Sequence, residues 1–415
     1  MTTIQKQGAA AVEAARFLST CGTEAKNKAL AAIADALESR MDEVLAANAL
    51  DMQAAKKSNM SPALQDRLSL TADRITGIAQ SVREVAALPD PIGKVDSVVT
   101  RPNGLEIKRV KVPLGVIAII FEARPNVTVD AAVLCLKSGN ASILRSGKEA
   151  INSNTAFADI MREAITSVGF PASCIDLIRD TSHEGANELM CLTDYVDVLI
   201  PRGGAGLINT VVQNARVPVI KTGVGNCHVY VDSKADLEMG AKIIFNAKCS
   251  RPSVCNAAET LLVARDIAKD FLPLAKAELD KMNVELRGCP ETQAILGSSV
   301  VPATEDDWSR EYGDYILAVK LVKDVHEAIE HINRYGTMHS EAIVTADNEA
   351  AELFVNAVDA AAVYHNASTR FTDGGEFGLG AEIGISTQKM HARGPMGLEQ
   401  LTSVKYVISG SGQVR

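Results

Sequence analysis

Apolar residues in the first 90 positions recur every three or four residues, the spacing of one face of a helix. The clearest stripe consists of Leu30, Ile33, Leu37, Met41 and Val44. Thr23 suits a helix start, and Pro89 with Pro91 ends the block. We therefore predict a helical N-terminal segment that serves as scaffold.

The next segment alternates between apolar and polar residues. Two β-rich runs, 98–100 and 105–110, flank Pro102-Asn103-Gly104, and Asn-Gly between such runs is the strongest short-range hairpin signal. We predict a hairpin over residues 97–111 and a terminal strand over Ser403–Ser409 that pairs with it. Such a hairpin is either an oligomerisation arm or a plain sheet edge.

From Val112 onward, short β-branched apolar runs alternate with helical stretches. The predicted strands are Val116–Phe121, Ser142–Arg145, Ile175–Ile178, Val196–Ile200 and Val217–Lys221, with helices over Ser153–Val168 and Gly203–Asn214. Strands that are apolar on both faces and separated by helices indicate a parallel, doubly wound sheet. This half of the chain is typical of a dinucleotide-binding domain.

A second alternating block begins near Leu237 and runs to about Asn366. It contains the predicted strand Glu259–Val263, helix Ile267–Met282, strand Leu317–Val322 and helix Val325–Tyr335, followed by glycine-rich loops. We expect an α/β fold with two doubly wound domains and a small β arm. Residues 1–96 and 112–235 would form the dinucleotide-binding domain, 236–395 the second domain, and 97–111 with 396–415 the arm.

Composition narrows the functional classes. A net charge of −9 argues against a nucleic-acid partner, which requires a basic surface. The longest apolar run, Val112 to Phe121, is too short to cross a membrane, and no basic-then-apolar leader is seen. Eight cysteines without paired spacing indicate reduced thiols, so a cytoplasmic protein is expected.

The string His326-Glu-Ala-Ile-Glu-His331 resembles a helical zinc motif. Its histidines are five residues apart, roughly 140° around a helix, whereas the zinc motif places them four apart on one face. We interpret the string as a solvated helix face and expect no metal site.

Cys255 is the candidate nucleophile. It lies in a polar loop just before a predicted strand, and Arg251 in the same loop would favour the reactive thiolate. Spacing alone leaves open that Cys255 is a small buried apolar residue. Likewise, Gly203-Gly204 after the strand Val196–Ile200 is either a phosphate or nicotinamide loop or a point of close packing.

Eight segments, in order along the chain, resemble the aldehyde dehydrogenase superfamily. They are Val112–Asn126, Lys137–Asn140, Ile143–Glu149, Ile200–Ala205, Lys221–Gly225, the Cys255 loop, Glu311–Tyr315 and Gly394–Thr402. The match is best to members that reduce an acyl phosphate, because of Phe-Glu-Ala-Arg-Pro-Asn at 121–126 and Ser-Arg-Pro-Ser-Val-Cys-Asn at 250–256.

The resemblance implies NADPH-dependent reduction of L-glutamyl 5-phosphate to L-glutamate 5-semialdehyde and phosphate, in proline biosynthesis. Cys255, in the catalytic second domain, would attack the acyl carbon. Asn126 would hold the oxyanion together with backbone N–H groups, unless it is only a turn former after Pro125. Arg124 and Arg251 would neutralise the substrate phosphate.

The resemblance also implies the cofactor contacts. Arg145 and Lys148 offer two cations for a 2′-phosphate, which favours NADP(H), unless they are solvated loop charges. Gly203 and Gly204 would lie beneath the pyrophosphate and nicotinamide, and Glu311 would hold the nicotinamide ribose.

Lys221 is the main departure from the superfamily pattern. Oxidising members have a glutamate there, the base that activates water against the thioester. Lys221 removes that base and supplies a cation near a leaving phosphate, or else it is a structural cation.

The expected partners are the small-molecule substrate and further copies of the chain, as a homodimer or homotetramer. An association with glutamate 5-kinase, which makes the unstable acyl phosphate, is also suggested. Two alternative functions stay open: another NAD(P)-dependent aldehyde dehydrogenase, which Lys221 disfavours, and a non-catalytic relative, which the intact Cys255 loop disfavours.

Overall fold

The computed structural model describes residues 1–415, except the side chains of residues 62 and 63. The chain forms two compact units. The first unit comprises Met1–Thr222, Gly378–Gly384 and Met396–Arg415, and the second comprises Gly223–Phe377 and Ile385–Pro395. Residues 223–235, predicted within the dinucleotide-binding domain, lie in the second unit, and residues 378–384, predicted within the second domain, lie in the first unit.

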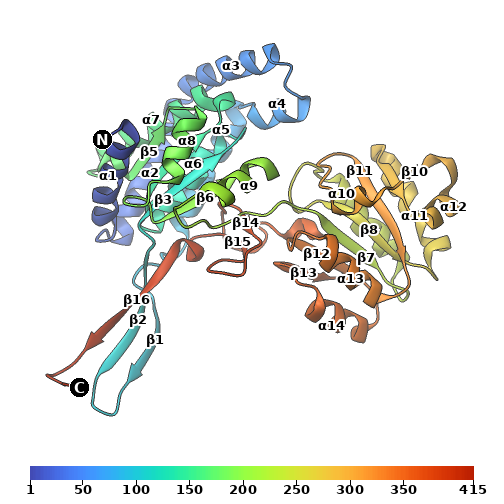
Figure 1. Cartoon of the computed structure of the whole chain (residues 1–415). Helices are drawn as coiled ribbons and strands as arrows, with labels where there is room; N and C mark the ends of the chain where they lie inside the picture. The colour runs from blue at the N-terminus through green and yellow to red at the C-terminus, as the bar shows by residue number, and fades with distance from the viewer. The chain divides into compact units, whose positions relative to one another are not determined.

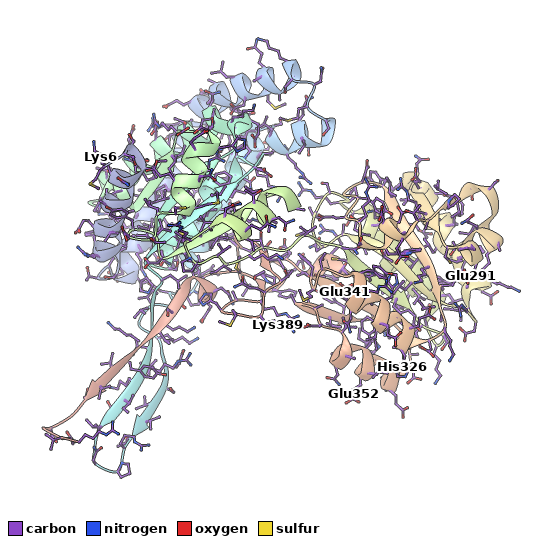
Figure 2. The ribbon with its side chains drawn as sticks, viewed as in Figure 1. Lys6, Glu291, His326, Glu341, Glu352 and Lys389 are labelled. Atoms are coloured by element: carbon purple, nitrogen blue, oxygen red, sulfur yellow. The ribbon has the colours of Figure 1, made fainter. Side chains whose placement is uncertain are left out.

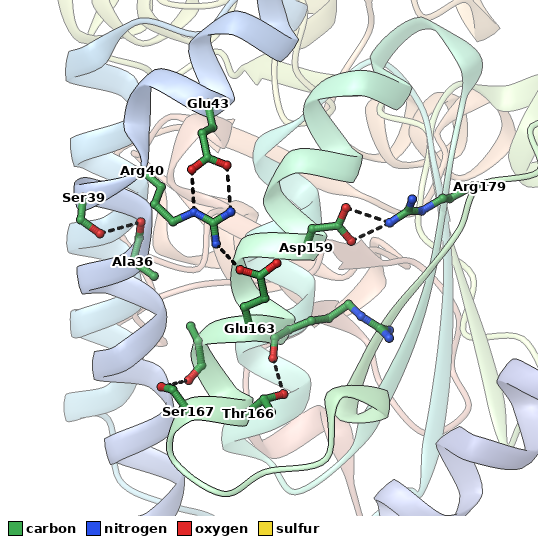
Figure 3. A network of polar contacts seen from close by, with 11 residues as sticks. Ala36, Ser39, Arg40, Glu43, Asp159, Glu163, Thr166, Ser167 and Arg179 are labelled. Carbon is green, nitrogen blue, oxygen red and sulfur yellow. Dashed lines mark hydrogen bonds and ion pairs between the residues drawn. The ribbon is translucent and has the colours of Figure 1, made fainter.

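Five helices open the first unit, as predicted (Figure 1). They are α1 (Thr3–Leu18), α2 (Thr23–Ser39), α3 (Met41–Lys57), α4 (Pro62–Leu68) and α5 (Ala72–Ala87). The predicted apolar stripe runs over two helices, because the chain leaves helical geometry at Arg40, with φ −113°. Arg40 donates to Glu43 at 2.8 Å and to Glu163 of α7 (Ile151–Ser167) at 2.7 Å, which ties the start of α3 to α7 (Figure 3).

A four-stranded parallel sheet forms the centre of the first unit, in the order β5-β4-β3-β6. Its strands are β3 (Val116–Phe121), β4 (Ala141–Ser146), β5 (Ile175–Ile178) and β6 (Val198–Arg202), connected through α6 (Asn126–Lys137), α7 and α8 (His183–Met190). Every residue of β3 and β4 is buried, which explains the continuous apolar run of β3.

The predicted strand Val217–Lys221 is wrong. Only an isolated bridge forms there, between Leu199 and Val219. Pro218 has no N–H to donate to a ladder, although its carbonyl accepts from Leu199 N at 2.8 Å. The segment therefore runs along β6 without joining the sheet as a strand.

The arm forms as predicted. Strands β1 (Val95–Thr100), β2 (Glu106–Pro113) and β16 (Thr402–Ser409) make an antiparallel sheet in the order β1-β2-β16. The turn between β1 and β2 includes Gly104 at φ +85°, a conformation that favours glycine. This turn and the C-terminus lie at the same end of the ribbon (Figure 1).

A seven-stranded parallel sheet forms the second unit, in the order β10-β9-β11-β8-β7-β12-β13. Its strands are β7 (Cys227–Val231), β8 (Ala258–Ala264), β9 (Glu285–Gly288), β10 (Val301–Pro302), β11 (Ile316–Val322), β12 (Ser340–Val344) and β13 (Ala362–His365). The main helices are α10 (Leu237–Cys249), α11 (Ala268–Leu279), α12 (Pro290–Leu296), α13 (Val325–Tyr335) and α14 (Asn348–Ala357).

Both faces of this sheet are covered. Leu261 and Val263 of β8 pack on the side of α10 and α11, whereas Leu262 between them packs with α13 and α14. The two doubly wound units confirm the predicted fold class. The sequence pattern missed β7, because its run begins with the polar Cys227-His228 directly after Gly225-Asn226.

The helix predicted over residues 325–335 is confirmed, but only one of its two histidines lies on a solvated face. His326, which Figure 2 labels, is exposed. His331 is 3% exposed and packs against Trp308 with ring centroids 5.7 Å apart. Burial lowers the pKa of His331 to about 2, so the ring stays neutral at physiological pH. Among the described helices, none combines the length and apolarity needed to cross a membrane.

Candidate active site

The residues predicted to carry the chemistry fall into two sets, one in each unit. The first unit holds Arg124, Asn126, Arg145, Lys148, Gly203, Gly204 and Lys221, and the second holds Arg251, Cys255 and Glu311. All eight cysteines of the chain are thiols rather than disulfides.

The Cys255 loop connects the end of α10 to the start of β8. Helix α10 stops at Cys249, where the Ser250 hydroxyl donates to Asn246 O at 2.7 Å, and Pro252 prevents the helix from continuing. Cys255 is half-buried, and Arg251 in the same loop is exposed. The loop thus presents a thiol and a cation from a short, non-helical segment.

Gly225 lies against this loop. A Cβ atom on Gly225 would stand 1.5 Å from the carbonyl oxygen of Cys255, so only glycine permits the approach. The N–H of Gly225 donates to Glu311 Oε1 at 3.0 Å. The backbone of Gly225 therefore contacts both the carbonyl of Cys255 and the carboxylate of Glu311. Cys227 lies beneath the loop, with its sulfur 3.2 Å from Cys255 O.

A buried ion pair fixes the segment that carries Glu311. Lys248 Nζ lies 2.7 Å from Glu259 Oε2, and both side chains are fully buried. The other oxygen of Glu259 accepts from Gly313 N at 3.1 Å. Burial raises the pKa of Glu259 to about 7, against the opposing effect of Lys248. The sequence pattern gave no reason to single out this pair.

In the first unit, the turn after β3 carries Arg124 and Asn126. Ala123 adopts φ +45°, which costs a residue with a Cβ about 1 kcal/mol. Its N–H donates to Glu149 Oε1 at 2.7 Å, and this bond holds the strained turn. The turn thereby has a fixed shape at the carboxyl end of β3.

Asn126 is the first residue of α6 and is half-buried. Its Nδ2 donates to Asp130 Oδ2 at 2.8 Å, one turn along the helix. Burial raises the pKa of Asp130 from its ordinary 3.8 to about 6, against the opposing hydrogen bond from Asn126. Asp130 orients the amide while leaving its second N–H to donate elsewhere. Asp130 was not predicted, although its spacing of four residues from Asn126 was a usable signal.

The two predicted cofactor cations differ in position. Arg145 is 8% exposed, and its Nη2 donates to the carbonyls of Thr181 and Ser182 at 2.8 and 2.9 Å. Lys148, in contrast, is exposed at the start of a short 3-10 helix after β4. Arg145 therefore braces the turn before α8, and Lys148 is the cation that faces solvent.

Gly203 and Gly204 stand between β6 and α9 (Ala205–Asn214). Gly204 caps α9, and nothing lies within 4 Å of the Cβ position it lacks. Its N–H already donates to Glu122 Oε2 at 3.2 Å, so this helix start accepts an anionic oxygen. Helix starts of this kind also bind phosphates, and in this structure the Glu122 carboxylate takes that position.

Lys221 is half-buried and is followed by Thr222, whose hydroxyl donates to Pro201 O at 2.6 Å. This bond fixes the chain beside the end of β6. The described part of the chain contains no group of three or more His, Cys, Asp or Glu side chains that could hold a metal ion.

Comparison with known proteins supports the resemblance. The sequence profile of the aldehyde dehydrogenase family matches residues 2–307. The chain is 60% identical to the gamma-glutamyl phosphate reductase of Moorella thermoacetica over 412 residues, which are 99% of this chain and 98% of that protein. The enzyme of the same name from Halothermothrix orenii is 58% identical over 409 residues, with the same coverage.

Solved structures agree. The crystal structure of gamma-glutamyl phosphate reductase from Thermotoga maritima is 50% identical, covers all of both chains and superposes with a TM-score of 0.97. An acetylating aldehyde dehydrogenase from Geobacillus thermoglucosidasius, 18% identical with a TM-score of 0.70 over 99% of this chain and 97% of its own, shares the fold. The chain therefore belongs to the aldehyde dehydrogenase family, and within it to the group of the gamma-glutamyl phosphate reductases.

Proposed function

We propose that this chain reduces L-glutamyl 5-phosphate to L-glutamate 5-semialdehyde and phosphate, a step of proline biosynthesis. The observation that carries the proposal is whole-length identity of 58–60% to relatives that bear the corresponding name. The intact Cys255 loop and the placement of Glu311 beside it support the same chemistry.

Cys255 is the proposed nucleophile. Its thiolate attacks the acyl carbon, the carbon–oxygen bond to the phosphate breaks, and the electron pair leaves on the phosphate. Hydride addition to the resulting thioester gives a thiohemiacetal, whose collapse releases the semialdehyde and the thiolate. Such covalent catalysis divides one difficult displacement into two easier steps.

Asn126 is the proposed oxyanion ligand in the first unit. Its amide is oriented by Asp130 and retains an N–H for the oxygen that becomes negative. A donor fixed in advance in this way is worth about 3 kcal/mol of barrier. Arg124 and Arg251 are the proposed partners of the substrate phosphate, because both are cations beside the two predicted reactive segments.

Lys221 is proposed to protect the thioester. The related oxidising enzymes have a glutamate base in this position, and a lysine there offers no carboxylate to take a proton from water. Its positive charge also favours a leaving phosphate. The substitution thus suits reduction of an acyl phosphate rather than its hydrolysis.

A nicotinamide cofactor is expected of this family, and we propose NADP(H). When bound, it supplies the hydride. Lys148 is the proposed contact of the 2′-phosphate, with Arg145 behind it as the brace of the neighbouring turn. Gly203 and Gly204 offer the start of α9 to the pyrophosphate, and Glu311 is the proposed ligand of the nicotinamide ribose.

We further propose a homodimer or homotetramer that assembles through the arm. Strand β1 is exposed over its whole length, and Val98, Val99, Tyr406 and Ile408 are exposed apolar side chains of the arm. Association with glutamate 5-kinase would shorten the path of the unstable acyl phosphate. The eight thiols fit a reducing, cytoplasmic setting.

The test follows NADPH formation from the semialdehyde, NADP+ and phosphate, the reverse of the proposed reaction. Cys255→Ala should abolish the reaction and leave NADPH protection in a thermal melt unchanged. Cys21→Ala, at another partly exposed thiol, is the matched control and should retain full activity. Substantial turnover by Cys255→Ala would exclude the covalent role.

Lys221→Glu provides the second arm of the test. It should lower phosphate-dependent turnover and release glutamate, because a carboxylate can then activate water. Wild-type turnover with no glutamate released would contradict the role given to Lys221.

A further inference from the structure

Arg370 lies across the loop that carries Cys255. Its Nε donates to Ser250 Oγ at 2.9 Å, and its Nη1 donates to Asn256 Oδ1. Ser250 opens the loop, and Asn256 directly follows Cys255. The guanidinium group is therefore held between the two ends of the segment that contains the proposed nucleophile.

The backbone around Arg370 is fixed to the same loop. Asn256, which is 4% exposed, donates through Nδ2 to Thr372 O at 2.9 Å and to Arg370 O at 3.3 Å. In return, the Thr369 hydroxyl donates to Asn256 O at 2.7 Å. Arg370 is thus anchored at both its backbone and its side chain, so its position requires little further ordering when a ligand binds.

The charge of Arg370 has no close carboxylate partner. Its two hydrogen-bond partners are neutral, and no ion pair joins it to any side chain that the structure describes. Asp373 is the carboxylate whose charge acts most strongly on Arg370, but its Oδ1 accepts from Gly375 N at 2.8 Å. Burial lowers the pKa of the half-buried guanidinium, which nevertheless stays protonated.

Such a cation suits an anionic ligand. A guanidinium has five N–H donors in a planar fork, and Arg370 uses two of them within the protein. The remaining donors match a planar carboxylate, which accepts two parallel hydrogen bonds from such a fork. Arg251, the other arginine near Cys255, is exposed and lacks this anchoring.

We propose that Arg370 binds the α-carboxylate of the substrate and so selects an amino-acid acyl group. This inference rests on the proposed function. The α-carboxylate lies four carbon–carbon bonds from the reacting carbon. The guanidinium of Arg370 is hydrogen-bonded to Asn256, the residue after Cys255, and is therefore near enough to reach that carboxylate. The phosphate, at the reacting carbon itself, is left to the other cations.

The experiment measures NADPH formation from the semialdehyde, NADP+ and phosphate for the wild type, Arg370→Met and Arg370→Lys. Arg370→Met should raise the KM for the semialdehyde about 100-fold while kcat changes less than about 3-fold, because ground-state and transition-state binding are lost together. Arg370→Lys keeps the charge but not the fork, so a rise of about 10-fold is expected. Arg334→Met, an exposed arginine of the second unit, is the matched control and should behave as the wild type.

A second measurement separates binding from a merely structural role. The rate at which neutral iodoacetamide alkylates Cys255, followed by peptide mass, reports whether the loop and its thiol are intact. The rate should stay within about 2-fold of the wild type in Arg370→Lys, which keeps the positive charge that favours the thiolate. A fall in kcat together with a changed alkylation rate would show that Arg370 only positions the loop, and would overturn the proposal.

Two further outcomes would overturn the proposed role of Arg370. If Arg370→Met raises the KM for phosphate instead of that for the semialdehyde, the residue belongs to the phosphate site and the proposal is wrong. If the wild type itself does not turn over the semialdehyde, the proposed function fails, and this assignment fails with it.

Discussion

The buried pair Lys248–Glu259 offers the sharpest test of how the second unit is held together. Lys248→Met removes the cation and leaves a carboxylate that is fully buried and 2.7 Å from the lost Nζ. Breaking a buried pair on one side costs about 3–5 kcal/mol, because the remaining carboxylate has no cation to offset its burial and keeps only the hydrogen bond from Gly313 N. For a unit of this size, each kcal/mol lowers the midpoint of unfolding by about 2–4 °C.

The chain provides its own probe for this measurement. Trp308 is the single tryptophan of the sequence and lies 6% exposed in the core of the second unit. Urea unfolding followed by its fluorescence therefore reports on the second unit. Lys248→Met, Glu259→Leu and the double variant form a double-mutant cycle. The double variant should lose less free energy of unfolding than the sum of the two single losses, by about 2 kcal/mol or more.

The same pair also connects to Glu311, the proposed ligand of the nicotinamide ribose. Glu259 holds Gly313 N, and this bond positions the segment that carries Glu311. The KM for NADP+ should thus rise in Lys248→Met even where the protein is fully folded. A loss of stability below about 1 kcal/mol, or strictly additive single losses, would refute the reasoning that the pair is a coupled, buried unit.

Two further predictions concern backbone space and ionisation. Gly225→Ala should abolish activity, because the added Cβ would stand 1.5 Å from Cys255 O. Gly77→Ala, in α5 with open space around the added Cβ, should instead stabilise the chain by about 0.5–1 kcal/mol. Thermal melts and turnover are measured for both variants, and an active Gly225→Ala enzyme would contradict the close approach. Asp130 has its pKa raised from 3.8 to about 6, so kcat/KM should fall as the pH drops below about 6 and the carboxylate that orients Asn126 is protonated. Because the folded state binds this proton more tightly than the unfolded chain, the contribution of Asp130 to stability is full below its ordinary pKa and is lost as the pH rises to about 6. Asp130→Asn should remove the inflection from the pH profile, and an unchanged profile would show that another group is responsible.

The sequence alone predicted those features that are local in the chain. The alternation of buried strands and helices and the hairpin at Asn103-Gly104 follow from periodicity and turn chemistry. The family resemblance likewise singled out Cys255 and Glu311, which the structure places on either side of Gly225. Each of these signals comes from residues that are neighbours in sequence.

Only the tertiary structure decided the rest, because the decisive contacts join residues far apart in the chain. Arg370 donates to Ser250 across a separation of 120 residues, and no spacing rule could have linked the two. Strand β7, whose first residues gave no strand pattern, becomes a central strand because β8 and β12 pair with its two edges. Arg145, expected to face a phosphate, is instead buried against carbonyls of a distant turn, since burial is a property of the fold and not of the residue type.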